Sequence, residues 1–232
     1  MRIILIGPPG VGKGTQAALL GGRKGVHSLS SGEIFRREIE AQTDLGRMAQ
    51  RYISHGELVP NGVTIEMMAK RLRDPEIRKN GFILDGFPRN IKQADSLQEI
   101  LTDLEMPIQR VFSLYAPDEL IVNRLSGRMG CTKCGAIYHS LSKPTTREGF
   151  CDACNSPIVV RSDDQPETIR ERLRIFREDT APVIEFYANL GLTSTVDASR
   201  DAEEVYKDII AEMANNAEIA NNTEIANNTE IA

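Results

Sequence analysis

The chain has 232 residues, of which 41% are hydrophobic and 26% are charged, and this composition is ordinary for a globular protein with a buried core. Its net charge of −5 argues against a protein that coats nucleic acid, and no apolar run approaches the roughly 20 residues that span a bilayer. Because no export signal precedes the first apolar run, we expect a cytoplasmic protein whose four cysteines do not form disulfides.

The first half of the chain alternates strand and helix patterns. Residues 2–6 are an apolar run typical of a buried strand in a parallel sheet, and a glycine-rich loop and a helix from residue 13 or 14 to about 20 follow it. The patterns then predict, in order, helices within 31–56, a helix near 63–73, a strand at 82–84, a helix over about 90–103, a strand at 110–115 and a helix from Asp118. This alternation favours an α/β fold with a parallel sheet flanked by helices.

Residues 129–162 interrupt this rhythm. They contain all four cysteines, several Gly and Pro residues and two short β-like pieces, so we expect a small inserted domain. A helix resumes at Pro166, where Ile169, Leu173 and Phe176 share one apolar face. A strand near 193–196 and a helix over about 202–213 complete the predicted fold.

Residues 215–232 are three copies of a hexapeptide: NNAEIA, NNTEIA and NNTEIA. A six-residue period turns successive isoleucines by about 240° around an α-helix, so Ile219, Ile225 and Ile231 share no face. We therefore expect a disordered tail with no catalytic role.

The loop Gly-Pro-Pro-Gly-Val-Gly-Lys-Gly-Thr, residues 7–15, carries a strong functional signal. Its glycines let the backbone adopt positive φ and bring successive N–H groups close to phosphate oxygens, and the helix that follows adds a partial positive charge. Lys13 supplies a cation for the β and γ phosphates of a nucleoside triphosphate. A glycine-rich turn without a ligand is the alternative, which the combination of strand, loop, lysine and helix disfavours.

One position departs from the common form of this motif. Gly14 follows Lys13 where a Ser or Thr usually contacts Mg²⁺, and the hydroxyl comes one residue later, on Thr15. We therefore expect Mg²⁺ to be held mainly by phosphates and water. Asp85, at the end of a predicted strand, is placed to hold a metal-bound water, and a structural cap of the next turn is the alternative.

Further motifs occur along the chain in a recognisable order. After GPPGVGKGT come SSGEIFR, LDGFPRNIKQAD (84–95), GRMGCTKCGAIYH (127–139), RSDDQPETIRERL (161–173) and TAPVIEFY (180–187). Together they resemble the adenylate kinase family in its long-lid, zinc-containing type, and the resemblance extends from residue 1 to about 213. The Asp-Gly-Phe-Pro-Arg segment with its downstream Gln is far more specific than the phosphate loop alone.

This resemblance implies a P-loop nucleoside-triphosphatase-like core at 1–29, 61–126 and 164–214, an NMP-binding helical lobe at 30–60 and a zinc-stapled lid at 127–163, followed by the tail. ATP is expected at Gly10, Val11, Gly12, Lys13, Gly14, Thr15, Arg128, Ile137, Tyr138 and Arg200. AMP is expected at Ser31, Arg36, Glu57, Leu58, Val59, Gly86, Phe87, Pro88, Arg89, Gln93, Arg161 and Arg172. The implied catalytic set is Lys13, Asp85, Arg89, Arg124, Arg128, Arg161 and Arg172.

Two nucleotides bring much negative charge together, so such a site needs several guanidinium groups, whose planar forks match phosphate oxygens. Arg124 and Arg128 are four residues apart, and we expect them to share a helical face. On the helix from Pro166, Arg172 flanks the buried face, where a cleft contact is expected. The surface side of that helix is expected to carry Arg170, Arg174 and Arg177.

The cysteines form two C-x-x-C pairs, Cys131 with Cys134 and Cys151 with Cys154, a spacing typical of a structural zinc site with four thiolate ligands. Four free thiols or a redox pair are the alternatives, and iron fits the same sulfur tetrahedron. A zinc ribbon can also bind nucleic acid, but this lobe lacks interleaved basic and aromatic residues.

The predicted activity is reversible transfer of the γ-phosphoryl group of MgATP to AMP, giving two ADP. Ser31 and Glu33 stand where the family usually has Thr and Asp, and we expect at most a modest change in AMP affinity. The alternatives are a kinase for UMP or CMP, which the long lid disfavours, and a P-loop ATPase with a zinc module for nucleic acid. We expect a monomer with nucleotides as its partners and neither nucleic acid nor membrane.

Overall fold

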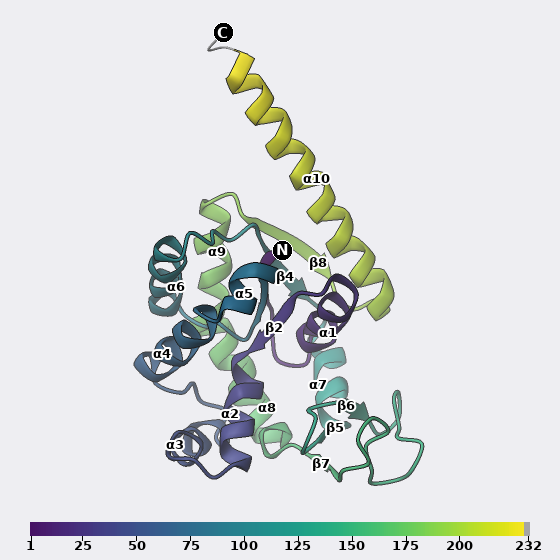
Figure 1. Ribbon diagram of the computed structural model, residues 1–232. Coiled ribbons are helices and arrows are strands. Elements are labelled where there is room, and N and C mark those ends of the chain that lie inside the picture. Colours follow the sequence, from purple (N-terminus) through teal and green to yellow (C-terminus); the bar gives the residue numbers. More distant parts are fainter. Residues whose placement is uncertain (230–232) are drawn as a thin grey trace.

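The computed structural model describes the backbone of residues 1–229, with the side chains of residues 1–161 and 163–215. A five-stranded parallel sheet lies at the centre of the main body (Figure 1). Its strands are β1 (Arg2–Ile6), β2 (His27–Ser30), β3 (Phe82–Asp85), β4 (Arg110–Tyr115) and β8 (Thr193–Asp197), in the order β2-β3-β1-β4-β8. The apolar run at the start of the chain is therefore the central strand, which confirms the predicted parallel sheet.

Alternate side chains of β1 face two layers of helices, because successive side chains of a strand point to opposite faces. Ile4 and Ile6 pack in a cluster with α4 (Asn61–Leu72), α5 (Pro75–Asn80), α6 (Ile91–Asp103) and α9 (Ala181–Asn189). Ile3 and Leu5 pack on the other face with α1 (Lys13–Lys24) and α10 (Ala202–Thr229). Burial on both faces explains why these strands read as continuous apolar runs.

Two smaller units are inserted into this core at the same end of the molecule, with α8 (Pro166–Ile175) between them in Figure 1. The first contains α2 (Ser31–Glu40) and α3 (Asp44–Ile53), which pack around Phe35 and Ala49. The second follows α7 (Asp118–Ser126) and is an antiparallel sheet of β5 (Arg128–Cys131), β6 (Ile137–His139) and β7 (Ile158–Val160), in the order β6-β5-β7.

Several elements had no clear signal in the sequence patterns. In β2, an edge strand, only Leu29 is buried, so there is no alternation to detect. The two helical patterns within 31–56 are α2, which ends at Glu40, and α3, which is capped by Thr43, whose hydroxyl accepts a hydrogen bond from the Gly46 N–H (3.0 Å). The predictions also omitted α5, α9 and a wide π-helical turn at Phe176–Thr180 that joins α8 to α9.

The last helix is longer than predicted, since α10 continues to Thr229 instead of ending near residue 213. Residues 215–229 contain Ala and Glu but neither Gly nor Pro, so nothing in the sequence stops a helix that begins on the core. Figure 1 shows α10 extending away from the main body. Neither this long helix nor any other in the described part of the chain is apolar enough to cross a bilayer. Residues 230–232 of the expected tail lie outside the described residues.

Candidate functional site

The glycine-rich loop connects the end of β1 to the start of α1 and has the strained conformation that its glycines allow. Gly10 and Gly12 have φ of 80° and 113°. A Cβ at Gly10 would lie 2.7 Å from Cγ of Leu125, so the loop also packs too closely on α7 for a larger residue. No side chain of the described residues caps the start of α1, which leaves its N–H groups available to an anion.

Lys13 folds back over this loop. Its Nζ donates hydrogen bonds to the carbonyl oxygens of Gly7 (2.7 Å) and Pro8 (2.9 Å). Burial lowers the pKa of Lys13 to about 8; Asp85 opposes the shift, whereas Arg89 and other arginines add to it. A buried cation with a lowered pKa is poised to gain from a phosphate placed beside it.

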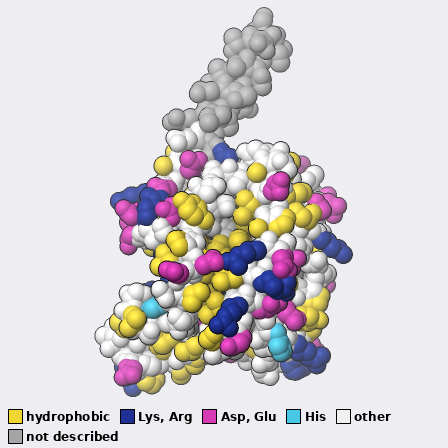
Figure 2. All heavy atoms as spheres, turned by 180° about the vertical axis from the view of Figure 1, so that it is seen from behind, with side chains coloured by type: hydrophobic (Ala, Val, Ile, Leu, Met, Phe, Trp, Pro, Cys, Tyr) yellow, Lys and Arg dark blue, Asp and Glu magenta, His cyan; other side chains and the backbone are white. Residues whose placement is uncertain are grey.

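Several arginines surround the same region and repel one another. Burial, followed by the charge of Arg172, lowers the pKa of Arg89 to about 10. Burial, followed by the charges of Arg36 and Arg128, lowers the pKa of Arg161 to about 9. Figure 2 shows Lys and Arg side chains gathered across the middle of one face of the molecule. Such a concentration of cations favours the binding of a polyanion.

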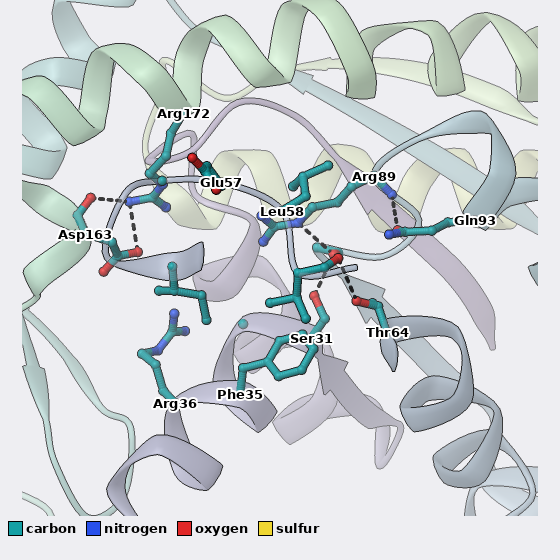
Figure 3. Close-up of a pocket in the computed structure, with 15 residues that line it drawn as sticks. Ser31, Phe35, Arg36, Glu57, Leu58, Thr64, Arg89, Gln93, Asp163 and Arg172 are labelled. Carbon is teal, nitrogen blue, oxygen red and sulfur yellow. Dashed lines mark hydrogen bonds and ion pairs between the residues drawn. The ribbon is translucent and has the colours of Figure 1, made fainter. Parts of the chain in front are cut away.

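A first pocket lies between α2, the segment after α3 and the loop after β3 (Figure 3). The Ser31 hydroxyl donates to the Gly86 carbonyl (2.6 Å). Gln93 accepts from the Arg89 N–H through Oε1 (2.8 Å) and donates through Nε2 to Asn61 (2.9 Å). Of the residues predicted to bind AMP, those that line this pocket are Ser31, Arg36, Glu57, Leu58, Val59, Gly86, Arg89, Gln93 and Arg172.

The remaining predicted AMP residues lie elsewhere. Phe87 is buried in the hydrophobic core, and Pro88 lines a second pocket. Arg161 lies at the base of the lid, where its Nε would be 3.4 Å from a Cβ on Gly130. Sequence reasoning missed Phe35, Ile53, Thr64 and Asp163, which also line the first pocket. A buried Phe or Ile gives the same signal in a core as in a pocket, so no pattern distinguished them.

The second pocket adjoins the first and includes part of the phosphate loop. Its lining contains Gly7, Pro9 and Lys13 together with Phe176 and Thr180. The two pockets share Gly56, Leu58, Gly86, Arg89 and Arg172. A Cβ at Gly56 would lie only 2.9 Å from Cγ of Arg172, so this glycine leaves room for the arginine between the pockets. Two ligands bound in these pockets would meet at Arg89 and Arg172.

A buried acidic pair that sequence reasoning left unassigned holds two of the arginines. Arg172 Nη1 lies 3.0 Å from Asp163 and 2.9 Å from Asp164, and Arg128 makes a paired contact with Asp164 at 2.6 and 2.7 Å. Burial alone would raise the pKa of Asp163, but Arg172 and the other arginines lower it below its usual range. The only signal in the sequence was two adjacent aspartates directly before a helix.

Arg124 and Arg128 do not share a helical face, contrary to the expectation. α7 ends at Ser126, and Arg128 begins β5. Arg124 donates instead to the carbonyl oxygens of Val11 (3.2 Å), Ala198 (2.9 Å) and Ser199 (3.4 Å). It therefore ties the phosphate loop to the segment that follows β8.

The other predicted contacts lie outside the two pockets. Asp85 lies next to the loop, with Oδ2 3.7 Å from a Cβ on Gly14. Tyr138 is buried in the small sheet, where its hydroxyl contacts Cys151 Sγ (3.3 Å), whereas the neighbouring Ile137 is half-buried. Arg200 is exposed and pairs with Asp208.

The three arginines expected on the surface of α8 and the turn after it are confirmed there. Arg170 lies 4.0 Å from Glu167, Arg174 pairs with Glu171 (2.6 Å), and Arg177 pairs with Asp118. Their side chains are at least half exposed, so these pairs contribute little to stability.

The four cysteines converge in the small sheet. Their sulfur atoms all lie within 4.8 Å of one another, with Cys131 to Cys154 at 3.4 Å and Cys134 to Cys151 at 3.5 Å. A zinc ion bound at about 2.3 Å by four tetrahedral thiolates would separate the sulfurs by roughly 3.8 Å, so this cluster fits that metal. A hydrogen bond from the Tyr138 hydroxyl lowers the pKa of Cys151, which favours the thiolate that a metal requires. All four thiols are free of disulfides.

The small sheet also reaches the lobe of α2. A Cβ at Gly135 would lie 3.1 Å from Oε1 of Glu33, so the turn between the first two cysteines and β6 lies against that helix. The two inserted units therefore meet over the cleft in this conformation.

Comparison with known proteins gives a consistent result. A family model described as adenylate kinase matches residues 5–192. The chain is 43% identical to the adenylate kinase of Lachnoclostridium phytofermentans over 210 residues, which are 90% of this chain and 96% of that protein. It is 43% identical to that of Clostridium beijerinckii over 93% of this chain and 100% of the relative. It is 42% identical to the adenylate kinase of Methanosarcina mazei over 94% of this chain and 100% of that protein.

Proposed function

Since the chain belongs to the adenylate kinase family of phosphotransferases, which act on ATP and AMP, we propose that its two adjoining pockets bind these two nucleotides. A phosphoryl group is then transferred reversibly from one nucleotide to the other. The reaction is ATP plus AMP to give two ADP. The observation that carries this proposal is the wall that the pockets share. Arg89 and Arg172 line both, so each can contact two phosphate groups at once.

AMP occupies the first pocket in this proposal. Arg36, Arg89 and Arg172 face its phosphate, and Gln93 and the backbone of 57–59 face its base. Ser31 holds the Gly86 carbonyl and thereby shapes the wall beside the phosphate. Phe87 contributes indirectly in this arrangement, through the core, and Pro88 through the second pocket. Arg161 approaches the phosphates from the base of the lid.

ATP lies along the loop of residues 10–15, with Lys13 at its β and γ phosphates. Arg128, which the buried Asp164 orients, adds a second cation, and Arg124 acts by holding the loop through the Val11 carbonyl. Ile137 offers the exposed part of its side chain to the adenine, with Tyr138 behind it and the backbone near Arg200 on the other side.

The chemistry needs little more than position and charge. The acceptor phosphate of AMP is ionised at neutral pH, so no general base is required. Five cations neutralise the negative charge that spreads over the transferred phosphoryl group: Lys13, Arg89, Arg128, Arg161 and Arg172. The wall that the two pockets share aligns donor and acceptor. Adenylate kinases use Mg²⁺ with their nucleotides, and the ion supplies charge neutralisation at the β and γ phosphates when it is bound. Asp85 and Thr15 lie at the loop, where they would hold water molecules bound to the ion.

The four-cysteine cluster is a structural metal site in this proposal, with zinc as its occupant. Four protein ligands leave no open position for a substrate, so the metal cross-links the lid and takes no part in the reaction. The lid lies close to the lobe of α2, where Gly135 comes near Glu33, and in this proposal a lid in this position keeps water from the phosphoryl group. We also propose that the protein acts in the cytoplasm as a monomer.

A coupled assay of ADP formation tests the activity. The full chain is supplied with MgATP and, in turn, AMP, UMP, CMP or GMP, and we expect kcat/KM for AMP to exceed the others by about a hundredfold. A preference for UMP or CMP would favour the rival kinase. Intact ATP binding without turnover that depends on any acceptor would exclude the kinase function altogether.

A further inference from the structure

The wide turn between α8 and α9 places one hydroxyl against the loop that carries Arg89. The turn comprises Phe176–Thr180 and is a π-helix, a rare form that occurs often at functional sites. Thr180, its last residue, is 7% exposed and lines the second pocket. Its Oγ1 donates a hydrogen bond of 2.8 Å to the main-chain carbonyl of Arg89.

The turn also determines which side of the helix Thr180 faces. In an uninterrupted α-helix of 3.6 residues per turn, residues 172 and 180 would be rotated by about 80° from each other. A π turn contains one residue more than an α turn, which reduces this rotation. Thr180 therefore comes close to the face that bears Arg172, and both residues line the second pocket.

The hydroxyl is directed at Arg89 and not at its own helix. Thr180 occupies the position before α9, where a threonine hydroxyl commonly accepts a hydrogen bond from the first helical turn. It makes no such cap bond here. The one hydrogen bond of its hydroxyl within the described part of the chain is the bond to Arg89.

Arg89 is held at three points. Its N–H donates to Gln93 Oε1 (2.8 Å), its Nε donates to the Gly86 carbonyl (2.9 Å), and its carbonyl accepts from Thr180. The two terminal guanidinium nitrogens form no hydrogen bond to any residue that the structure describes. The main chain of Arg89 is thus fixed while the end of its side chain stays available to ligands in both pockets.

We propose that Thr180 is a positioning residue for phosphoryl transfer, which acts through the main chain of Arg89. The proposal rests on the proposed function, since the wall that Arg89 forms is where the two nucleotides meet. Misplacement of a positioning group by about 1 Å can lower turnover a hundredfold. Loss of the Thr180 hydroxyl therefore lowers kcat more than it weakens ATP binding, because the hydroxyl bonds to Arg89, whereas Lys13 is held by the carbonyl oxygens of Gly7 and Pro8.

The experiment compares Thr180→Val, which removes the hydroxyl and keeps the shape, with Thr180→Ser, which keeps the hydroxyl. We expect Thr180→Val to lower kcat by about ten- to a hundredfold with KM for ATP nearly unchanged, and Thr180→Ser to restore most of the rate. Thr193→Val is the matched control, since it removes a hydroxyl bond to the Ile184 carbonyl outside both pockets. Equal rates for Thr180→Val and the wild type, or equal losses for the Val and Ser variants, would overturn the proposal.

Amide hydrogen exchange of residues 86–90 in the nucleotide-free protein gives a second measurement. Thr180→Val should speed exchange there and Thr193→Val should not; unchanged exchange would count against Thr180 even if the wild type had no kinase activity. Inactivity of the wild type together with faster exchange in Thr180→Val would instead contradict only the proposed function. If Thr180→Val does not fold, Thr180→Ala removes the same hydroxyl without adding a methyl group and is measured in its place.

Discussion

The cleft and the lid of this protein are stabilised in different ways. The cleft draws on segments far apart in the chain, and its cations are held by a large sheet and two layers of helices. The lid is one continuous segment with three short strands, and its buried cluster consists of Tyr138 and two of the four cysteines. The cleft therefore keeps its shape without a ligand, but the burial of its charges costs free energy of folding. The lid has little apolar core and depends on a cross-link for its stability.

The largest expected effect comes from the cleft and is a loss of rate without a loss of stability. Lys13→Met removes a buried cation of lowered pKa and replaces it with an apolar chain of similar length. We expect kcat to fall at least about a thousandfold, because a cation on the transferred phosphate is lost, with the melting temperature unchanged or raised. Steady-state kinetics and calorimetry measure the two quantities.

Lys24→Met is the control for this substitution, since Lys24 lies on the same helix and is exposed. It should leave both quantities unchanged. A Lys13→Met protein with near-normal turnover would refute the proposed role of Lys13. A Lys13→Met protein that unfolds would show that the cleft, like the lid, depends on this group for its stability.

The second prediction concerns the lid, where we expect a large loss of stability. Removal of the metal by a chelator, or Cys151→Ser, should lower the apparent melting temperature by about 5 to 15 °C. Hydrogen exchange should rise within 127–163, while residues 1–126 keep their protection. Metal analysis of the untreated protein should give one zinc per chain.

Leu141→Ala serves as the control, because Leu141 belongs to the lid and its side chain is 87% exposed. We expect no change in its metal content or melting temperature. Protein that contains far less than one metal ion per chain and still has a protected lid would disprove the cross-link.

The smallest expected effect is a pH dependence confined to the cleft. The pKa of Lys13 is about 8 in the fold and about 10.5 when the chain is unfolded. The folded state thus carries a charging cost that is fully present below pH 8 and is relieved as the pH rises from 8 to 10.5. ATP phosphates favour the cation, so binding above pH 8 should take up a proton, and affinity should fall by at most about tenfold per pH unit.

Calorimetry of ATP binding at pH 9, in two buffers of different ionisation enthalpy, measures this proton uptake. Lys13→Met should abolish it. Binding to the wild type without proton uptake at pH 9 would show that the lysine is fully charged before ATP arrives.

The parts of the fold with a regular pattern could be predicted from the sequence. Residues 2–6 read as a buried strand because both faces of β1 are covered. Of the three residues predicted on one apolar face of the helix from Pro166, Ile169 and Leu173 pack in one cluster, but Phe176 lies in the wide turn after α8 and packs against another. The cysteine spacing predicted the cluster because metal chemistry fixes it. β2 and the wide turn at Phe176–Thr180 could not be predicted from the sequence. An edge strand with one buried residue and a helix with a single extra residue in one turn leave no periodic signal.

For the candidate site, motif residues such as Ser31, Gln93 and Arg172 could be named, and the structure brings them into one pocket. Their supports could not be named, because Asp163, Asp164 and Thr180 are ordinary polar residues until the fold places them against an arginine. The grouping of Arg124 with Arg128 failed because it assumed a helix that ends two residues earlier, at Ser126.

The strand order of the main sheet has a consequence for how the protein is made. β1 pairs with β3 and β4, yet β3 begins only at Phe82. At about 5–20 residues per second, a ribosome needs roughly 4 to 15 s to supply that partner, during which an apolar strand has no sheet to join. The phosphate loop waits longer, because Gly7 and Gly10 pack against Leu114 and Leu125. The loop is thus among the first parts of the chain to be synthesised, but it gains the neighbours that shape it only after the chain has been made as far as Leu125.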